Sequence, residues 1–448
     1  MAAVRNRRAI RWLRSQLPEL IDSGVITSDA ARAIDRHYQQ DQPRSNFAFA
    51  LLTTLGSALV AAGVILLIAH NWDELSRATR TAIAFLPLLI AQALVVFTLI
   101  RRNESRPWRE AAAIFDIAAV ATAISLISQT YQLQGTFADF MRTWLLLSIP
   151  IVYLLRTTLG AIAYVIGSAL WLFARWEILS SPGNPMLFWL LVMLVIPYVV
   201  IRFRRNRDSR ETATLVIIVA LAALFGVGAT AEFAAANVGV IAYAGLSTAI
   251  YLCGIKLFPQ PPGRLHPLAV LGGIAIGIVA IVLSFEWSWH MTHHVTSAPR
   301  SWPTNIAVAV ELLFPVAAVC LASFDLFRSR AEFSLSAALL PIISAVVWAI
   351  ANVCGPPNER FQSTPCSFAA ATVMNCYALL LGIDILARGI RTNSIARANF
   401  GLLLIAVLAI CRFFDSDLSF VTRGIGFIVV GAGFLVANVL LFKRRTAS

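Results

Sequence analysis

The Lys and Arg residues of this chain alternate in density along the sequence, and this pattern constrains the fold more than any other feature. Fourteen apolar runs divide the rest of the chain into fifteen segments. The odd-numbered segments hold 28 of the 36 Lys and Arg residues when each basic residue inside a run is counted with the nearer segment. One such cluster contains Arg101, Arg102, Arg106 and Arg109. Cytoplasmic loops of membrane proteins accumulate Lys and Arg. The pattern therefore predicts a multi-pass membrane protein with both termini in the cytoplasm.

The apolar runs have the length of membrane-spanning helices, which take about 20 residues. We expect an all-α polytopic transmembrane bundle of about 14 spans at residues 47–442, after a cytoplasmic helical hairpin at 1–46 and before a basic tail at 443–448. The fourth and fifth runs are short and adjacent, so they either both span or form a re-entrant pair. The runs are Phe47–Ala69, Thr81–Ile100, Ala111–Ser128, Phe140–Leu155, Thr158–Phe173, Pro185–Ile201, Ala213–Ala231, Val238–Leu257, Leu265–Phe285, Ile306–Phe324, Phe333–Val353, Phe368–Ala387, Ala398–Phe414 and Leu418–Leu441.

The composition favours a lipid environment over a nucleic-acid partner. Hydrophobic residues make up 58% of the chain and charged residues 13%, whereas soluble domains carry about 25% charged residues. The net charge of +13 lies in short clusters at run ends, where basic residues orient helices and contact anionic head groups. We expect the lipid bilayer as a partner and no nucleic acid. Within the ninth run, the spacing of Gly273 and Gly277 predicts close helix packing.

The first 46 residues predict two short helices joined by a turn. Gly24 is placed to end the first helix, and Thr27 or Ser28 is placed to cap the second. The apolar residues of the first helix recur at helical spacing: Ile10, Leu13, Leu17 and Ile21. A hairpin of this size cannot build a core alone. It either packs on the membrane domain or on a protein partner, or lies on the membrane surface as a basic helix.

Polar residues follow two apolar runs that end on the same, outer membrane face. His70 and Asn71 follow the first run, and Gln129 and Tyr131 follow the third. Lipid offers no hydrogen-bond partners, so these groups either join helix ends or form a ligand site.

Ionisable residues in the runs extend this candidate cluster, because charge is costly in lipid. Glu311 lies near the outer end of the tenth run and Arg412 near the outer end of the thirteenth, so Glu311 or Glu232 is placed to pair with Arg412. Pairing of this kind is either structural or part of a substrate or proton path. Snorkelling or pairing with loop Arg residues accounts for Asp116 and Asp384.

Two outer loops carry Cys and His residues, which can form a disulfide or bind a metal ion. Cys354 and Cys366 share the loop after the eleventh run, and an oxidising outer compartment predicts a disulfide between them. His290, His293 and His294 have a spacing that suits a metal ion, but no Cys or Asp completes the ligand set locally. We therefore expect no metal site, and no cofactor motif is present.

Two motifs resemble a bacterial family of multi-pass membrane proteins, the domain-of-unknown-function 2157 family. They are Leu67-Ile68-Ala69-His70-Asn71-Trp72 and Ser128-Gln129-Thr130-Tyr131 followed by Trp144. The opening Leu20-Ile21-x-x-Gly24-Val25-Ile26-Thr27 is similar too, whereas Gln132 stands where His is expected. The resemblance covers about residues 10–175. It implies an integral protein of the bacterial cytoplasmic (inner) membrane and brings no activity with it.

Three function classes remain open, and we rank them in this order. The first is a transporter or flippase-like carrier of a polar or amphipathic solute, which many spans and short loops favour. The second is a non-enzymatic scaffold or sensor that docks a protein partner through residues 1–46. The third is an intramembrane transferase acting on a lipid-linked substrate. That class usually has a long outer loop after the first span, and here the gap is only His70–Arg80.

Overall fold

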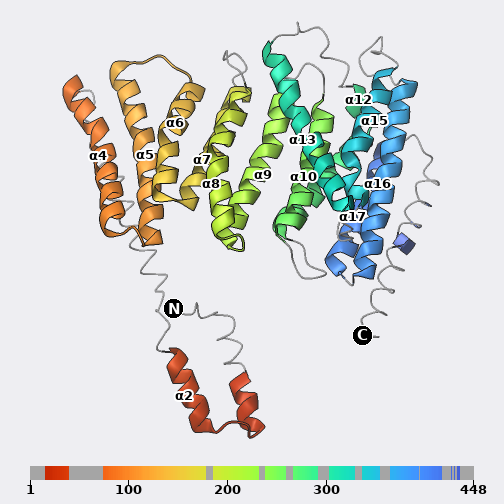
Figure 1. Cartoon of the computed structure of the whole chain (residues 1–448), viewed down its shortest axis with the longest axis horizontal. Helices are drawn as coiled ribbons and strands as arrows, with labels where there is room; N and C mark the ends of the chain where they lie inside the picture. Colours follow the sequence, from red (N-terminus) through yellow and green to blue (C-terminus); the bar gives the residue numbers. More distant parts are fainter. Residues whose placement is uncertain are drawn as a thin grey trace. The chain divides into compact units, whose positions relative to one another are not determined.

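The computed structural model of the chain describes a set of helices (Figure 1). The described residues are 16–39, 74–177, 185–231, 238–258, 266–290, 302–327, 335–353, 364–392 and 394–415, with 425, 428 and 431–433. No strand occurs among them. Contacts divide the chain into two units, Met1–Arg80 and Thr81–Ser448.

The described part of the N-terminal unit is a helical hairpin, as predicted. Residues 16–22 are helical, and α2 follows at Ser28–Gln39. Gly24 ends the first helix with a φ of 71°, the left-handed conformation in which Gly carries no steric cost. The Thr27 Oγ1 atom accepts a hydrogen bond from the Ala30 amide at 3.2 Å, so Thr27 caps α2.

The larger unit is a bundle of apolar helices. In the residues that the structure describes, nine helices are long and apolar enough to cross a membrane, and three shorter apolar helices accompany them. They account for the second to the thirteenth predicted run, and the predicted helical membrane bundle is confirmed. The first run and most of the fourteenth lie outside the described residues. The helices are α4 (Arg77–Arg101), α5 (Arg106–Tyr131), α6 (Phe137–Leu155), α7 (Thr158–Glu177), α8 (Leu187–Arg205), α9 (Arg210–Ala231), α10 (Gly239–Leu257), α11 (Pro267–Leu283), α12 (Trp287–His290), α13 (Trp302–Phe327), α14 (Leu335–Ala338), α15 (Leu340–Val353), α16 (Pro365–Arg391) and α17 (Ile395–Asp415).

The fourth and fifth runs form two separate helices joined by a tight turn. The turn is made by Arg156, whose φ of 50° reverses the chain between α6 and α7. The helices have 19 and 20 residues, so each rises about 30 Å, the thickness of a bilayer core. These lengths are compatible with two crossings, and the crossing of both helices stays a prediction.

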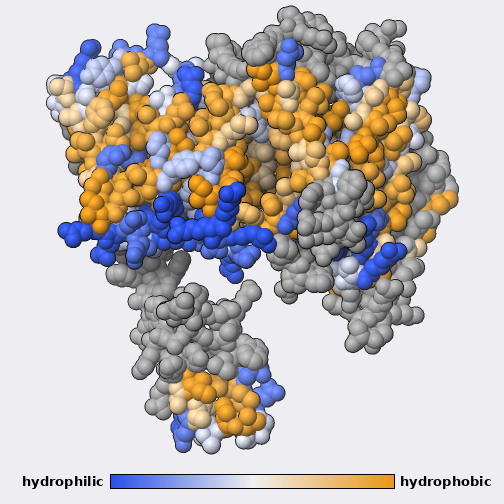
Figure 2. Space-filling model, in the orientation of Figure 1, coloured by the Kyte–Doolittle hydropathy of each residue, from blue (hydrophilic) through white to orange (hydrophobic). Residues whose placement is uncertain are grey.

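The surface of the bundle separates apolar from charged residues. Leu89, Leu147 and Ile278 are among many large apolar side chains that remain exposed, as expected of a surface that faces lipid. Figure 2 shows hydrophilic residues gathered along the lower edge of α4 to α9. Exposed Arg residues at the C-terminal end of α8, such as Arg204 and Arg205, belong to the basic segments of the sequence.

Close helix packing occurs one residue away from the predicted Gly pair. A Cβ atom on Gly272 would lie 2.3 Å from the Tyr251 backbone N, whereas one on Gly273 would lie 3.9 Å from Tyr251 Cδ2. On the facing helix, a Cβ atom on Gly254 would lie 2.3 Å from the Ala269 N. Gly254 and Gly272 therefore let the backbones of α10 and α11 approach each other.

Candidate binding site

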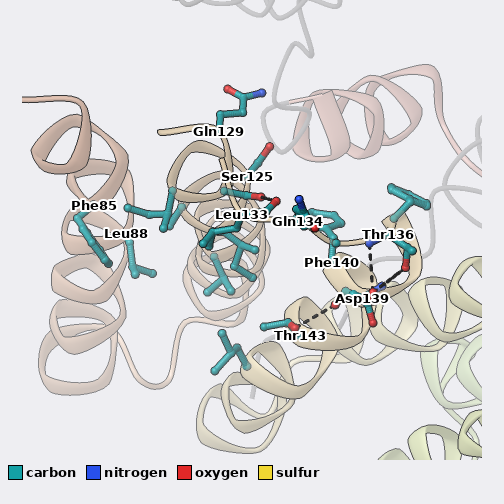
Figure 3. A pocket seen from close by; sticks show the side chains of 18 of the residues that line it. Phe85, Leu88, Ser125, Gln129, Leu133, Gln134, Thr136, Asp139, Phe140 and Thr143 are labelled. Atoms are coloured by element: carbon teal, nitrogen blue, oxygen red, sulfur yellow. Dashed lines mark hydrogen bonds between the residues drawn. The ribbon is translucent and has the colours of Figure 1, made fainter. Parts of the chain in front are cut away.

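A cavity of about 780 Å³ lies between α4, α5 and α6. Figure 3 shows Phe85 and Leu88 on α4, facing the side chains of α5 and α6 across it. Ligand pockets typically enclose about 300–1,000 Å³ and combine apolar walls with a few polar groups. The cavity has that composition. Its polar lining residues are Gln92, Ser125, Ser128, Gln129, Gln134, Thr136, Asp139 and Thr143.

The polar end of the cavity is shaped by the connection between α5 and α6. Gln132 ends α5 with a φ of 50°, and the Leu133 amide donates to the Ser128 carbonyl oxygen at 3.0 Å. Thr136 and Asp139 then form a capping box, in which the Asp139 amide donates to Thr136 Oγ1 at 3.2 Å. This reciprocal capping fixes where α6 begins. The hydroxyl and amide groups at this end of the cavity are thus held in place by the end of α5 and the start of α6.

Gln92 and Asp116 form a polar contact in the wall between α4 and α5. The Gln92 Nε2 atom donates to Asp116 Oδ1 at 2.7 Å, and Asp116 is only 3% exposed. Gln92 also lines the cavity. Asp116 was expected to snorkel or pair with a loop Arg, and the structure instead binds it to an amide on the neighbouring helix. A lone Gln within the apolar run Thr81–Ile100 was the signal for this partner.

The structure places two members of the predicted cluster, Gln129 and Tyr131, at the end of α5. Gln129 lines the cavity, but its side chain points away from the other lining residues (Figure 3). Tyr131 is 49% exposed, and its hydroxyl lies 3.1 Å from Thr81 Oγ1. His70 and Asn71 lie outside the described residues, so their convergence with Gln129 stays a prediction.

Trp144 links α6 to α5. Its indole Nε1 donates to the Ile117 carbonyl oxygen at 2.8 Å, and its ring stacks on Phe140 at 6.5 Å between ring centroids. Phe140 in turn lines the cavity. This residue of the recognised motif therefore holds together two of the three helices around the cavity.

Glu311 and Arg412 lie elsewhere and are not paired with each other. Glu311 is 0% exposed on α13, and neither carboxyl oxygen has a hydrogen-bond partner. The Arg412 Nη2 atom donates to Ser284 Oγ at 3.4 Å, and its guanidinium lies 4.4 Å from the Phe285 ring centroid. Neither residue lines the cavity. Glu311 and Arg412 are therefore not part of this cavity, and the convergence of the whole outer cluster stays a prediction.

A charged cluster at the basic edge of the bundle was not predicted. Glu110 of α5 is 8% exposed and accepts hydrogen bonds from the amides of Thr158 at 3.0 Å and Leu159 at 2.9 Å, at the start of α7. Glu211 of α9 pairs with Arg106 and with Arg202, the latter at 2.6 Å. These contacts join the ends of four helices. Asp384 forms an ion pair with Arg388 of its own helix at 2.8 Å and accepts a hydrogen bond from Ser336 of α14 at 2.6 Å.

The predicted disulfide falls largely outside the described residues, and so does the His motif at which we expect no metal. Cys366 is disulfide-bonded, whereas Cys354 is not among the residues described, so their pairing stays a prediction. The side chains of His290, His293 and His294 are not described either. No group of three or more His, Cys, Asp or Glu residues suited to a metal occurs in the described part of the chain.

The comparison with known families identifies the first third of the chain. A family model described as "Predicted membrane protein (DUF2157)" matches residues 18–159. The match covers the hairpin, the cavity helices α4 to α6 and the motif that contains Gln129 and Trp144, so the resemblance seen in the sequence is confirmed. No curated protein and no solved structure matches the chain. Residues 18–159, about a third of the chain, are therefore similar to the DUF2157 family of predicted membrane proteins.

Proposed function

We propose that this protein is a carrier that moves an amphipathic solute through the membrane. The cavity between α4, α5 and α6 is the observation that supports the proposal, because it combines apolar walls with a polar end. Its lining runs along α5 from Gln129 to Val120, a rise of about 13 Å. That distance is almost half of a bilayer core, which is about 30 Å thick.

The distribution of side chains in the cavity suits a molecule with a polar head and an apolar tail. Gln134 and Thr136 lie at the connection between α5 and α6 and offer amide and hydroxyl groups to a head group. Phe85, Leu88 and Leu147 offer apolar surface to a tail. Gln92, bound to Asp116, supplies a second polar position further along the path.

Carriage is tested in vesicles that contain the purified protein and fluorescent phospholipids, one anionic and one zwitterionic. The wild type should increase the fraction of probe that dithionite bleaches, relative to vesicles without protein. Ser125→Trp should reduce this increase, because Ser125 lines the cavity and an indole would fill it. Thr122→Trp is the matched control, since Thr122 is exposed on the same helix and does not line the cavity.

Two outcomes would contradict the carrier function. In the first, neither phospholipid moves faster with the wild type than without protein. In the second, the Trp substitutions at Ser125 and Thr122 lower the rate equally, which would show that the cavity is not the path.

A docking function for the N-terminal hairpin is the second candidate. Val25 is 69% exposed and Ile21 is 37% exposed at the turn of the hairpin, and apolar side chains of this size favour contact with a protein partner. Ile21→Ser with Val25→Ser should then abolish recovery of cross-linked partners and leave phospholipid movement unchanged. We do not propose the transferase alternative.

A further inference from the structure

The buried carboxyl of Glu311 is not explained by the proposed carrier cavity. Glu311 lies within the apolar helix α13 and is 0% exposed. Both of its carboxyl oxygens lack a hydrogen-bond partner. Transferring an ionised carboxylate into such a site costs several kcal/mol unless hydrogen bonds or a cation compensate it.

The polar side chains that face Glu311 do not supply those hydrogen bonds. They are Thr230 of α9 and Tyr243 of α10. Thr230 has a single hydroxyl proton, and it is directed to the Gly226 carbonyl oxygen at 2.8 Å. The Thr230 oxygen accepts from the Trp189 indole at 3.4 Å. Thr230 is thus better placed to accept a hydrogen bond from a protonated Glu311 than to donate one to its carboxylate.

The described helices that pack on α13 bring no cation to Glu311. Lys256 of α10 donates to the Leu321 carbonyl oxygen at 2.7 Å, and Leu321 is ten residues further along α13, a rise of about 15 Å. Arg210 and Glu211 lie at the opposite end of α9 from Thr230. The described sequences of α14 and α15 contain no ionisable residue.

The start of α10 lies close enough to the Glu311 carboxyl to stabilise its ionised form. A Cβ atom on Gly239, the first residue of α10, would lie 4.0 Å from Glu311 Oε2. The residue before it, Val238, provides no side-chain cap. The first amides of a helix lack internal partners and favour a negative charge. Burial favours the acid, whereas the positive end of the α10 dipole favours the carboxylate, so the site can bind and release a proton.

We propose that Glu311 is a proton-binding site within the membrane, whose carboxyl holds a proton in this conformation. The site is separate from the cavity between α4, α5 and α6. It therefore adds a proton as a second ligand, whichever solute the cavity takes.

The proton is detected directly by infrared spectroscopy of the purified protein in lipid nanodiscs at neutral pH. The difference between wild type and Glu311→Gln should contain the carbonyl stretch of one protonated carboxylic acid. Glu211→Gln is the matched control, because Glu211 is paired with two Arg residues and its removal should cost only carboxylate bands. Loss of carboxylate bands alone on substituting Glu311 would overturn the proposal.

Dicyclohexylcarbodiimide, which modifies protonated carboxyls in apolar surroundings, gives a second measurement that needs no variant. Peptide mass spectrometry should find the adduct on Glu311, with a yield that falls about tenfold for each pH unit above the titration midpoint. Glu211 in the same sample should stay unmodified. Absence of the adduct at every pH, or its suppression by sodium chloride relative to choline chloride, would overturn the proposal. Neither measurement involves a carried solute, so failure here leaves the carrier function untouched.

Discussion

At the scale of single residues, Glu110 shows how one carboxylate can determine a helix junction. Its oxygens accept from the Thr157 hydroxyl and from the amides of Thr158 and Leu159. Amides at a helix start have no partner within the helix. Glu110 therefore performs, from α5, the capping that a local residue usually performs.

Glu110→Ala should lower the stability of the protein by about 1–3 kcal/mol, because it leaves buried amides at the start of α7 without acceptors. Thermal unfolding in detergent would show this as a lower Tm than that of the wild type. Glu104→Ala is the control, since Glu104 is exposed in the neighbouring loop and its loss should change the Tm little. Equal Tm values for both variants would mean that Glu110 does not cap α7.

The start of α11 should become less stable at acidic pH, because its capping residue is His266. It lies directly before α11, its ring stacks on Phe258 at 3.9 Å, and its Nδ1 atom accepts from the Leu268 amide at 3.2 Å. Burial lowers the pKa of His266 below its usual value, which is about 6.5. The neutral ring is therefore favoured in the folded state. The neutral His266 ring therefore contributes its full stabilisation of the folded state above about pH 6.5. This stabilisation is lost as the pH falls through the lower pKa of the folded state.

The expected result is a Tm that decreases on acidification more in the wild type than in His266→Asn. Asn keeps a capping oxygen at this position and does not titrate. Identical acid profiles for the two proteins would assign the decrease to other groups.

Residue-scale contacts were only partly predictable. Gln129 and Tyr131 were identified from the polar motif, and both lie at the end of α5. The groups that face Asp116, Glu110 and Glu311 come from helices 24 to 81 residues away in sequence. Apart from the lone Gln92 in its apolar run, the sequence carries no signal for these contacts.

At the scale of helices, hydropathy was sufficient to find the elements but not their contacts. A helix that is apolar on every side can pack on its neighbours with any of its faces. Its sequence therefore does not show which face contacts a neighbouring helix. The pair Gly273 and Gly277 has the favoured spacing, yet Gly272 and Gly254 make the close approach.

Gly254→Ala and Gly273→Ala test whether α10 and α11 approach each other at Gly254 or at the Gly273–Gly277 pair. A methyl group at Gly254 would meet the Ala269 backbone at 2.3 Å, so we expect a loss of about 1–3 kcal/mol from overpacking. At Gly273 the nearest side-chain atom is 3.9 Å away, and Ala should be neutral or stabilise the helix by up to about 1 kcal/mol. Thermal unfolding of both variants is the measurement. The reverse order of stability would contradict the packing of α10 on α11.

At the scale of the whole molecule, the basic segments predict the side of the membrane on which each loop lies. The loop at Gln134 contains no Lys or Arg, whereas the C-terminal tail contains Lys443, Arg444 and Arg445. Fusions of alkaline phosphatase and of a fluorescent protein should therefore place Gln134 outside and Lys443 inside. Both reporters on one side would overturn a topology with the two termini in the cytoplasm.

The sparse packing of α4 has a consequence for selectivity. Only four of its 25 residues are buried, namely Ala84, Ala91, Val95 and Thr98, while Trp144 ties α5 to α6. A cavity with two fixed walls and one weakly held wall changes its width at low energetic cost. In the carrier that we propose, solutes with tails of different length and saturation would then fit equally well. The protein would then distinguish solutes by their head groups. Substitutions at the α5–α6 connection would be the way to change which head group it prefers.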